Sequence, residues 1–579
     1  MPTRSDQRPP WMLLLFVGLF LSMAVWVLLA QGLAFVGQFA LPKALVAYGL
    51  VMGPVAYWYV HDATPFWALG PPPRFALPRG RARWVAVSSV VHVLWLLLPL
   101  LAWPVLFHRR QVWVPWDVVY YHLPKAADLV QKGHMWNLAL PYGQYPIGWE
   151  SWLALLLGLH GHALGLGVLS ALAVVLWLLA WWALLTQRAA LPASLAGALV
   201  GLLASLFAGL GSVLLLSAGK NDVFASALVL VGLWHAWQPT RVHRRGLLLA
   251  LAAAWAVKPW AGVVLLGLWL MRGRHGRLRG WFLPGGLAVL AGSLWLVRNL
   301  VLMGRPSSPI GWELQQRALV FAMASDAFWR PLSPIFLLLT GSVLGFALWA
   351  WRRPHWREDV RIYLWLYAVF LVTPAVVQPG PRPTIQWRFA LTLFAWLGVL
   401  LARGGVALAL ALARWWRGKP GATLVRGWLP ALALPGLFLG LDGYLAGMWH
   451  FEPRAAYIVE DPFLEPPSRG RYGSVFAYID EQVHGAIIEP QGTVPIPFYY
   501  LYDPQLSNQG ARPGHFPAGL PQAVPQPQPT HMLYCSVHRM YRGYFVVHDP
   551  AAVREKRARW YREGHRILYF DPACVLAAK

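Results

Sequence analysis

Long apolar stretches without a charged residue constrain this chain more than any other feature of its sequence. They cover residues 12–36, 84–107, 163–186 and 192–218, and a fifth apolar stretch, 428–449, has a single charged residue, Asp442. A helix needs about 20 apolar residues to cross the hydrocarbon core of a bilayer, so each stretch is long enough to span. Only 12% of the 579 residues are charged, whereas a soluble fold normally carries about 25%. The sequence therefore predicts a polytopic α-helical membrane protein.

The basic residues predict which way the chain is threaded. The formal net charge is +26, and its densest runs fall in short loops between apolar stretches: 74–83, 241–245, 272–279, 352–361 and 414–426. Short loops rich in Lys and Arg mark the cytoplasmic side of a multi-pass protein and lie against anionic lipid headgroups. The chain shows no nucleic-acid-binding module, so we expect membrane lipids and no nucleic acid as partners of this charge.

Thirteen crossings place every strongly basic loop on one side. The predicted helices are 12–36, 43–60, 84–107, 163–186, 192–218, 222–238, 246–257, 259–271, 281–301, 332–351, 361–378, 388–402 and 428–449. The first is too long for a secretory signal, so we expect it to be retained with a cytoplasmic N-terminus. The break at Lys258 and Pro259 predicts two short half-membrane helices with Lys258 at the outer tip.

Two parts of the chain are expected outside the membrane helices. A long outer loop covers 108–162, and its apolar stretch 146–159 is predicted to be an interfacial helix. After a transmembrane domain over 1–449, residues 450–579 form an extracytoplasmic α/β domain with helices at 471–482 and 551–564 and strands at 486–489, 544–548 and 566–570. The two cysteines, Cys535 and Cys574, fall there. An oxidising compartment permits a disulfide, but two free thiols fit the sequence equally well.

Polar residues gather at the outer ends of the predicted helices. The candidate site residues are Asp117, Tyr121, His122, Glu150, Lys220, Asp222, Lys258, Arg298, Asn299 and Arg388. Charge at membrane depth costs about 2.5–3.5 kcal/mol on insertion scales and therefore suggests function. A single Lys or Arg there is more often an interfacial cation. Four cations opposite Asp117 favour a site for a lipid phosphate.

The order of these motifs resembles the membrane-embedded type C glycosyltransferases that use polyprenyl-phosphate sugars, which include the protein O-mannosyltransferases and the lipid A aminoarabinose transferases. The matching segments, over about residues 84–415, are 117–124 (DVVYYHLP), 145–150 (YPIGWE), 220–222 (KND), 258–259 (KP), 298–299 (RN) with Gly304, Pro306 and Pro309, and 387–389 (WRF). The resemblance implies that Asp117 is the catalytic carboxylate. Two departures are Val118, where many relatives have a second acid, and the two helices over about 12–60.

The chemistry is coherent for transfer from such a donor. A sugar on a lipid phosphate already has a good leaving group, so one base on the acceptor hydroxyl suffices and inversion is expected. A glycosidase would need two carboxylates flanking the bond. We expect a polyprenyl-phosphate-linked sugar donor and a glycan, lipid or protein acceptor in a bacterial cell membrane.

Other functions and ligands fit less well. A lipid-linked polysaccharide polymerase or ligase would depend on Arg and His in a large late outer loop. A multispanning transporter would show internal repeats and polar residues near the midplane. The sequence indicates no cofactor with certainty and leaves a divalent cation open. His160 and His162 alone do not make a metal site.

Overall fold

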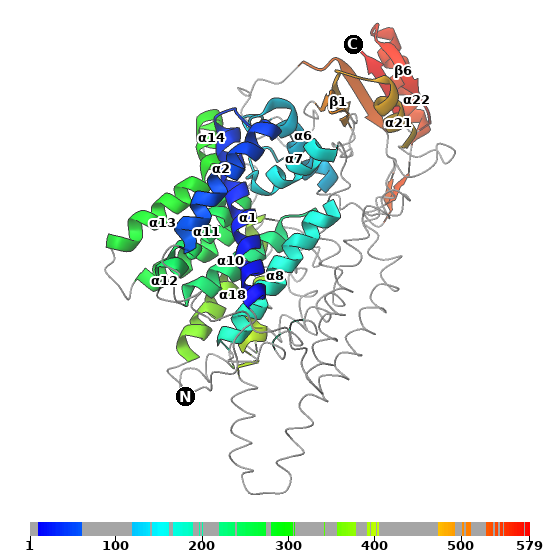
Figure 1. Ribbon diagram of the computed structural model, residues 1–579. Helices are drawn as coiled ribbons and strands as arrows, with labels where there is room; N and C mark the ends of the chain where they lie inside the picture. The colour runs from blue at the N-terminus through cyan, green and yellow to red at the C-terminus, as the bar shows by residue number, and fades with distance from the viewer. Residues whose placement is uncertain are drawn as a thin grey trace, which may run out of the picture.

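The structure is a computed structural model of the whole chain. It describes residues 10–60, 118–138, 140, 142–160, 166–188, 196, 200, 219–237, 240–273, 279–304, 306, 341, 345, 356–377, 391–393, 395–400, 402–403, 473–491, 501–502, 505–510, 528–535, 539–541, 545–547, 549–572 and 574–579. The described residues form a helix bundle joined to a small mixed sheet (Figure 1).

The bundle is built around a buried helix. The helix α10 (Asp222–Ala236) is buried along its whole length and packs on α8 (Leu166–Arg188), α11 (Arg241–Val257) and α12 (Pro259–Gly273). The helices α1 (Pro10–Phe35) and α2 (Leu41–Val60) pack on each other, and α18 (Arg357–Val377) packs on α12. We call the end of the bundle at Asp222 the site end and the end at Ala236 the opposite end.

Some helices of the bundle have the length and apolar character of membrane spans. Within the described residues, the segments Leu13–Phe35 and Leu166–Arg188 are long and apolar enough to cross a membrane. A third span forms if the bent pair α13 (Arg279–Gly292) and α14 (Leu294–Met303) counts as one crossing. The predicted helices 84–107, 192–218, 332–351 and 428–449 lie wholly or largely outside the described residues, so the number thirteen stays a prediction.

The hairpin of α11 and α12 differs from the predicted pair of half-membrane helices. The break falls at Lys258, as expected. However, α11 begins at Arg241, because Thr240 caps it by accepting a hydrogen bond from the His243 backbone N–H (3.4 Å). Its 17 residues extend about 25 Å, of which the apolar residues 246–257 make up about 18 Å. The hairpin therefore carries Lys258 to one end of the bundle and leaves Arg241 and Arg272 at the other.

The predicted single helix 281–301 is bent by 61° between α13 and α14. A β-carbon on Gly292 would lie 2.3 Å from the Ala252 carbonyl oxygen, so this position of α13 can approach α11 only as glycine. The bend frees backbone carbonyls, and Gln31 of α1 donates to those of Ala291 (3.2 Å) and Gly292 (3.3 Å). A Gly-Ser pair with a satisfied backbone is a known cause of such kinks. The sequence predicted one helix over 281–301, and the structure places this bend within it.

The segment that follows the predicted catalytic residue is helical. A π-helical turn η1 (Val118–His122) leads into α6 (Leu123–Lys132), which ends at Gly133 with φ of 67°. The sequence did not predict α6, although Pro124 in its first turn and Gly133 after its last are ordinary helix boundaries. The predicted interfacial helix appears as α7 (Gly148–His160) and packs on α6.

The C-terminal residues form a five-stranded mixed sheet in the order β2-β1-β3-β7-β6. Its strands are β1 (Ile487–Gln491), β2 (Gln509–Gly510), β3 (His531–Cys535), β6 (Arg566–Phe570) and β7 (Cys574–Ala578), and a separate hairpin pairs β4 (Arg539–Tyr541) with β5 (Phe545–Val547). The helices α21 (Gly473–Gln482) and α22 (Pro550–Arg562) lie near their predicted positions. The strands β2, β3, β4 and β7 were not predicted.

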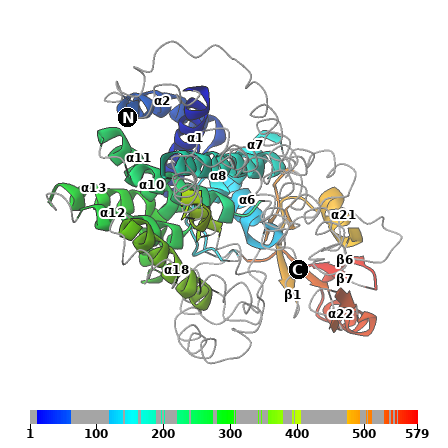
Figure 2. The same ribbon diagram turned by 90° about the horizontal axis from the view of Figure 1, so that it is seen from below.

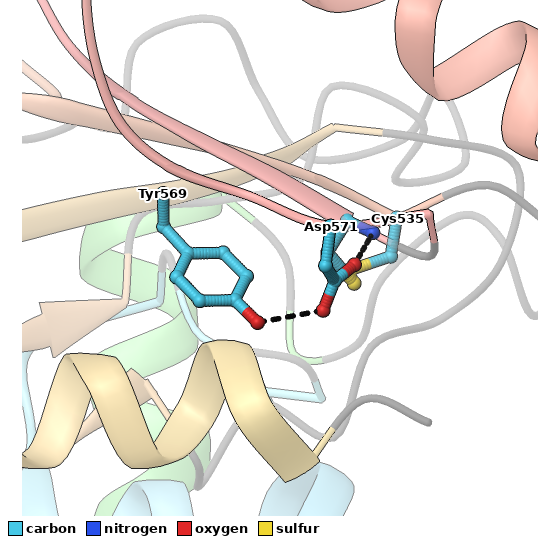
Figure 3. Close-up of a disulfide and its surroundings, with 4 residues drawn as sticks. Cys535, Tyr569 and Asp571 are labelled. Carbon is cyan, nitrogen blue, oxygen red and sulfur yellow. Dashed lines mark hydrogen bonds between the residues drawn. A yellow bond between two sulfur atoms is a disulfide. The ribbon is translucent and has the colours of Figure 1, made fainter. Parts of the chain in front are cut away.

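The two cysteines pair across the centre of this sheet. Cys535 of β3 and Cys574 of β7 are opposite each other in antiparallel register and form a disulfide, with Cα atoms 4.2 Å apart. The turn before β7 is fixed by Asp571, which accepts hydrogen bonds from the Tyr569 hydroxyl (2.7 Å) and the Cys574 backbone N–H (2.6 Å) (Figure 3). Of the two alternatives that the sequence left open, the structure has the disulfide.

The sheet is attached to the bundle through α6. The side-chain amide of Gln131 donates to the backbone carbonyls of Asn508 (2.6 Å) and Leu506. Asn508 is itself buried and bridges the Val483 carbonyl (2.6 Å) and the Ala486 N–H (2.8 Å), at the end of α21 and the start of the sheet. The C-terminal residues therefore contact the helix that follows η1.

Candidate functional site

A buried carboxylate lies at the centre of the site end. Glu150, in the first turn of α7, is 1% exposed. Its Oε1 atom lies 2.9 Å from His122 Nδ1 of η1 and 3.1 Å from Lys125 Nζ of α6. Lys125 also donates to the Pro146 carbonyl (3.4 Å). One carboxylate of α7 therefore contacts both η1 and α6, which follow each other in the sequence and lie more than 20 residues before it.

The charges in this cluster are set by burial and by each other. Burial raises the pKa of the Glu150 carboxyl, but the Lys125 charge and the His122 hydrogen bond outweigh burial and hold that pKa at about 2. Burial lowers the pKa of Lys125, and the Glu150 charge opposes that change. The charge of Arg298 lowers the pKa of Lys125 further, so Arg298 acts on the same cluster. We infer that Glu150 is ionised at neutral pH.

Aromatic rings surround the lysine of the cluster. The Lys125 ammonium lies 5.6 Å from the centre of the Tyr121 ring and 5.8 Å from that of Tyr145, within cation–π range. Tyr142 stacks on Tyr145 with ring centres 5.1 Å apart. Tyr142 adopts a left-handed backbone with φ of 51°, which is uncommon for a non-glycine residue and is often found at functional sites.

A second ion pair lies where α10 begins and the α11–α12 hairpin turns. The Lys258 ammonium forms a salt bridge with Asp222 and donates to Asn221 Oδ1 (2.8 Å). The Asn221 amide in turn donates to the Val257 carbonyl (3.3 Å). Asp222 is fully buried. The break at Pro259 therefore presents Lys258 to the 220–222 motif, so two motifs that were predicted to share a level are in direct contact.

Trp149 connects the two ion pairs. Its indole N–H donates to the Gly219 carbonyl (2.7 Å), two residues before Asn221, while Glu150 is the next residue along α7. Gly219 has φ of 75°, and a β-carbon there would lie 3.0 Å from Val118 Cγ1. Val118, the residue after Asp117 in the sequence, therefore packs directly against the turn that carries Lys220. The two clusters and the start of η1 belong to one structural unit.

Arg298 holds the loop between α6 and α7. It is 1% exposed and donates to the Met135 carbonyl (2.9 Å), the Tyr145 carbonyl (3.4 Å) and Asn299 Oδ1 (2.8 Å). Asn299 donates to the Gln144 carbonyl (2.8 Å). The bend before α14 brings both side chains to this loop. Arg298 therefore positions the backbone that carries Tyr145, whatever else it binds.

The structure brings together most of the site residues predicted from the sequence. Tyr121, His122, Glu150, Lys220, Asp222, Lys258, Arg298 and Asn299 all lie at the site end. Asp117 and Arg388 lie outside the described residues, so their placement stays a prediction.

The sequence reasoning missed Lys125, Trp149 and Tyr142. Lys125 was given no role from the sequence, and no helix was expected over 123–132. A helix over 123–132 would have placed Lys125 one turn after Tyr121, on the same face.

Among the described residues, no group of three or more His, Cys, Asp or Glu side chains is placed to hold a metal ion. His160 is the last residue of α7 and His162 lies outside the described residues. The divalent cation that the sequence left open therefore gains no ligand set from the described residues.

Comparison with known proteins found a structural match but no match to a family model or to a curated protein. No family model matches the chain, and no curated protein matches it. A solved structure with a similar arrangement is described as the crystal structure of ArnT from Cupriavidus metallidurans bound to undecaprenyl phosphate. The match has a TM-score of 0.48 and 15% sequence identity, and it covers 86% of this chain and 98% of that chain.

Proposed function

We propose that this protein is a membrane glycosyltransferase that moves a sugar from a polyprenyl-phosphate carrier to an acceptor hydroxyl, with inversion. The observation that carries the proposal is the single unit made by the Glu150 and Lys258 clusters around the start of η1. Buried charge of both signs is gathered at one end of an apolar bundle, directly after the residue that the sequence motif predicts to be catalytic. Charge in such a place is costly to keep without a function.

The proposed roles follow from the chemistry of the donor. Asp117 takes the proton of the acceptor hydroxyl as its oxygen attacks the anomeric carbon. The bond from that carbon to the phosphate oxygen breaks, and the lipid phosphate leaves with its electron pair. Lys220, Lys258, Arg298 and Arg388 are proposed to bind this phosphate, because cations stabilise the charge that develops on it.

The described contacts add detail to these roles. Lys258 is already held by Asp222, so its ammonium is positioned before donor binds. Lys125 lies within cation–π range of both the Tyr121 and the Tyr145 ring and joins the proposed donor-binding residues. Tyr121, His122, Glu150 and Asn299 shape the surroundings through the contacts described above.

Orientation is part of the proposal. We propose that the site end and residues 450–579 face the extracytoplasmic side of a bacterial cell membrane. Two observations support this. The basic ends of α8, α11 and α12 lie at the opposite end, where a cytoplasmic surface would have them. The disulfide between Cys535 and Cys574 suits an oxidising compartment.

The test is the substitution Asp117→Asn in the full chain, reconstituted with a polyprenyl-phosphate sugar. It keeps the size of the side chain and removes its basicity, so turnover should fall by about 10²–10⁴-fold, the usual share of general base catalysis. Binding of undecaprenyl phosphate should be unchanged, because Asp117 is not among the proposed phosphate ligands.

Matched controls separate the carboxylates at this end. Asp128→Asn removes a buried carboxylate of α6 that pairs with Lys132 and Asn137 and not with Glu150. The folded fraction of this variant should keep the turnover of the natural protein. Near-normal turnover in Asp117→Asn, together with a large loss in Glu150→Gln or Asp222→Asn, would move the base to one of those residues. If neither the natural protein nor any variant transfers sugar from a lipid-phosphate donor, the transporter or polymerase alternatives would be favoured.

A further inference from the structure

The helix α22 has two exposed sides of different charge. Its buried side is formed by Val553 and Trp560. At 100° per residue, one exposed side holds Arg554, Arg557, Ala558, Tyr561 and Arg562. The other side mixes signs, with Glu555, Arg559 and Glu563, and there Arg559 is paired with Glu563 (2.8 Å). We call the residues Arg554, Arg557, Tyr561 and Arg562 the basic face of α22.

The basic face is open and carries aromatic rings among its cations. Tyr561 is 75% exposed. The Arg557 guanidinium lies 4.4 Å from the centre of the ring of Phe570, at the end of the edge strand β6, and Phe570 is 36% exposed. Within the part of the chain that the structure describes, no carboxylate forms an ion pair with Arg554, Arg557 or Arg562. This surface therefore keeps its positive charge, unlike the other side of the helix.

The basic face points away from the bundle. Strand residues alternate between the two faces of the sheet, so Leu533 and Leu576 pack with α21 in the core that is continuous with the bundle. Met532 and Val575 point the other way and pack with Val553 and Trp560 of α22 in a separate core. Both views show α22 on the side of the sheet away from the membrane helices (Figures 1 and 2). The described helices of the bundle therefore do not cover this face.

We propose that the basic face of α22 binds an anionic carbohydrate chain. An Arg fork matches a carboxylate in a bidentate way, and the exposed Tyr561 ring offers a flat apolar surface for a sugar ring. Arg554 and Arg562 lie eight residues apart, about 12 Å along the helix, so a chain of repeated acidic sugars fits the face better than one small anion. Binding needs no transfer reaction, so this proposal and the proposed function fail separately.

The experiment measures binding of the full chain, in nonionic detergent, to immobilised polygalacturonate with neutral dextran as the reference. The matched pair is Arg557→Gln and Arg559→Gln, which make the same change on opposite sides of α22. Arg557→Gln should weaken binding about fivefold and Arg559→Gln should leave it unchanged, as expected for one exposed charged contact. Removing Arg554, Arg557 and Arg562 together should weaken it more than tenfold. Circular dichroism checks that each variant is folded.

A second variant tests the carbohydrate part of the proposal. Tyr561→Ala keeps every charge and should also weaken binding to polygalacturonate, whereas Tyr561→Phe should retain it. Equal effects of Arg557→Gln and Arg559→Gln would overturn the proposal, because binding would then depend on the total charge of α22 and not on the position of the charges on the basic face. So would an unchanged affinity in Tyr561→Ala, or tighter binding to phosphatidylglycerol vesicles that depends on the same arginines.

Discussion

The two ends of the helix bundle both contain buried charge, but they use it differently. At the opposite end, Asp359 of α18 is 1% exposed and forms salt bridges with Arg188 of α8 and with Arg403. The two guanidinium groups cover the rings of Trp237 (4.5 Å) and Trp356 (4.4 Å). These contacts tie helices to helices. At the site end, Lys125, Arg298 and Asn299 instead donate to backbone carbonyls of the loop between α6 and α7.

The comparison separates charges that hold helices together from charges that order a loop at the candidate site. A buried Arg–carboxylate–Arg group between packed helices needs no ligand to explain it. A set of cations that orders a loop next to exposed tyrosines does more than hold helices together, because the loop carries Tyr142 and Tyr145, each 37% exposed. We therefore expect substitutions at the opposite end to act on stability and those at the site end to act on both stability and activity.

The largest effect is expected for Asp359→Asn. Removing one partner of a buried ion pair typically costs about 3–5 kcal/mol, because the remaining charges are left uncompensated. Here two arginines would face each other, so the thermal unfolding midpoint in detergent should fall steeply. The neighbouring Glu358→Gln is the control: Glu358 is half exposed and pairs with Arg272 (3.2 Å) at the surface, so its effect should stay below about 1 kcal/mol. Equal effects of the two would contradict the contrast between the ends.

The next effect is an acid transition carried by Glu150. Its pKa is about 2 in the folded protein against an ordinary value of 4.5. A carboxyl whose pKa is lower in the folded state stabilises above its unfolded pKa, and the contribution is lost as pH falls from about 4.5 toward 2. The shift corresponds to roughly 3 kcal/mol. The free energy of unfolding of the natural protein should therefore fall between pH 6 and pH 2. The difference in this free energy between the natural protein and Glu150→Gln should become smaller over the same range. A constant difference would show that Glu150 is not an ionised partner of Lys125.

The outcome for the helices shows what sequence patterns can reach. The lengths of the apolar stretches predicted the bounds of α1, α2, α8 and α10 to within a few residues. The break at Lys258–Pro259 was also predicted correctly. Both signals, hydropathy and proline, can be read from the local sequence. The bend at Ser293 could not be seen, since it depends on the approach of Gly292 to Ala252 in another helix.

The candidate site shows the same division between local and long-range information. The motifs identified which residues share one end of the bundle. The pairing of Lys258 with Asp222, and of Lys125 with Glu150, depends on helix packing that no local pattern encodes. Strands β3 and β7 were also missed; they pair with each other at Cys535 and Cys574, which are 39 residues apart in the sequence.

A smaller effect is expected for Arg298→Lys, which keeps the charge and removes the guanidinium fork. A lysine cannot reach the Met135 carbonyl, the Tyr145 carbonyl and Asn299 together, so about two hydrogen bonds are lost, worth about 2 kcal/mol. If Arg298 acts by ordering the loop, the affinity for undecaprenyl phosphate should fall about tenfold in spite of the retained charge. If Arg298→Lys changes neither the affinity for undecaprenyl phosphate nor the turnover, only the positive charge matters, and the loop does not need the hydrogen bonds of the guanidinium.

The smallest effect tests the link between the site end and the C-terminal sheet. Gln131 lies on α6, the helix that also carries Lys125 of the site end, and it holds the sheet through the carbonyls of Leu506 and Asn508. Gln131→Leu removes both contacts but keeps the size and helix propensity of the side chain, so it should cost about 1 kcal/mol. The loss should appear as faster protease cleavage near 505–510 and not as a lower unfolding midpoint of the bundle, because the helix–helix contacts at the opposite end are untouched.

The matched control is Lys132→Leu, one residue along the helix. Among the described residues, Lys132 forms an ion pair with Asp128 of the same helix (2.6 Å), so its loss should leave cleavage near 505–510 unchanged. Equal cleavage in both variants would mean that the sheet is held by its apolar contacts alone, and that α6 transmits nothing from the C-terminal residues to the site end.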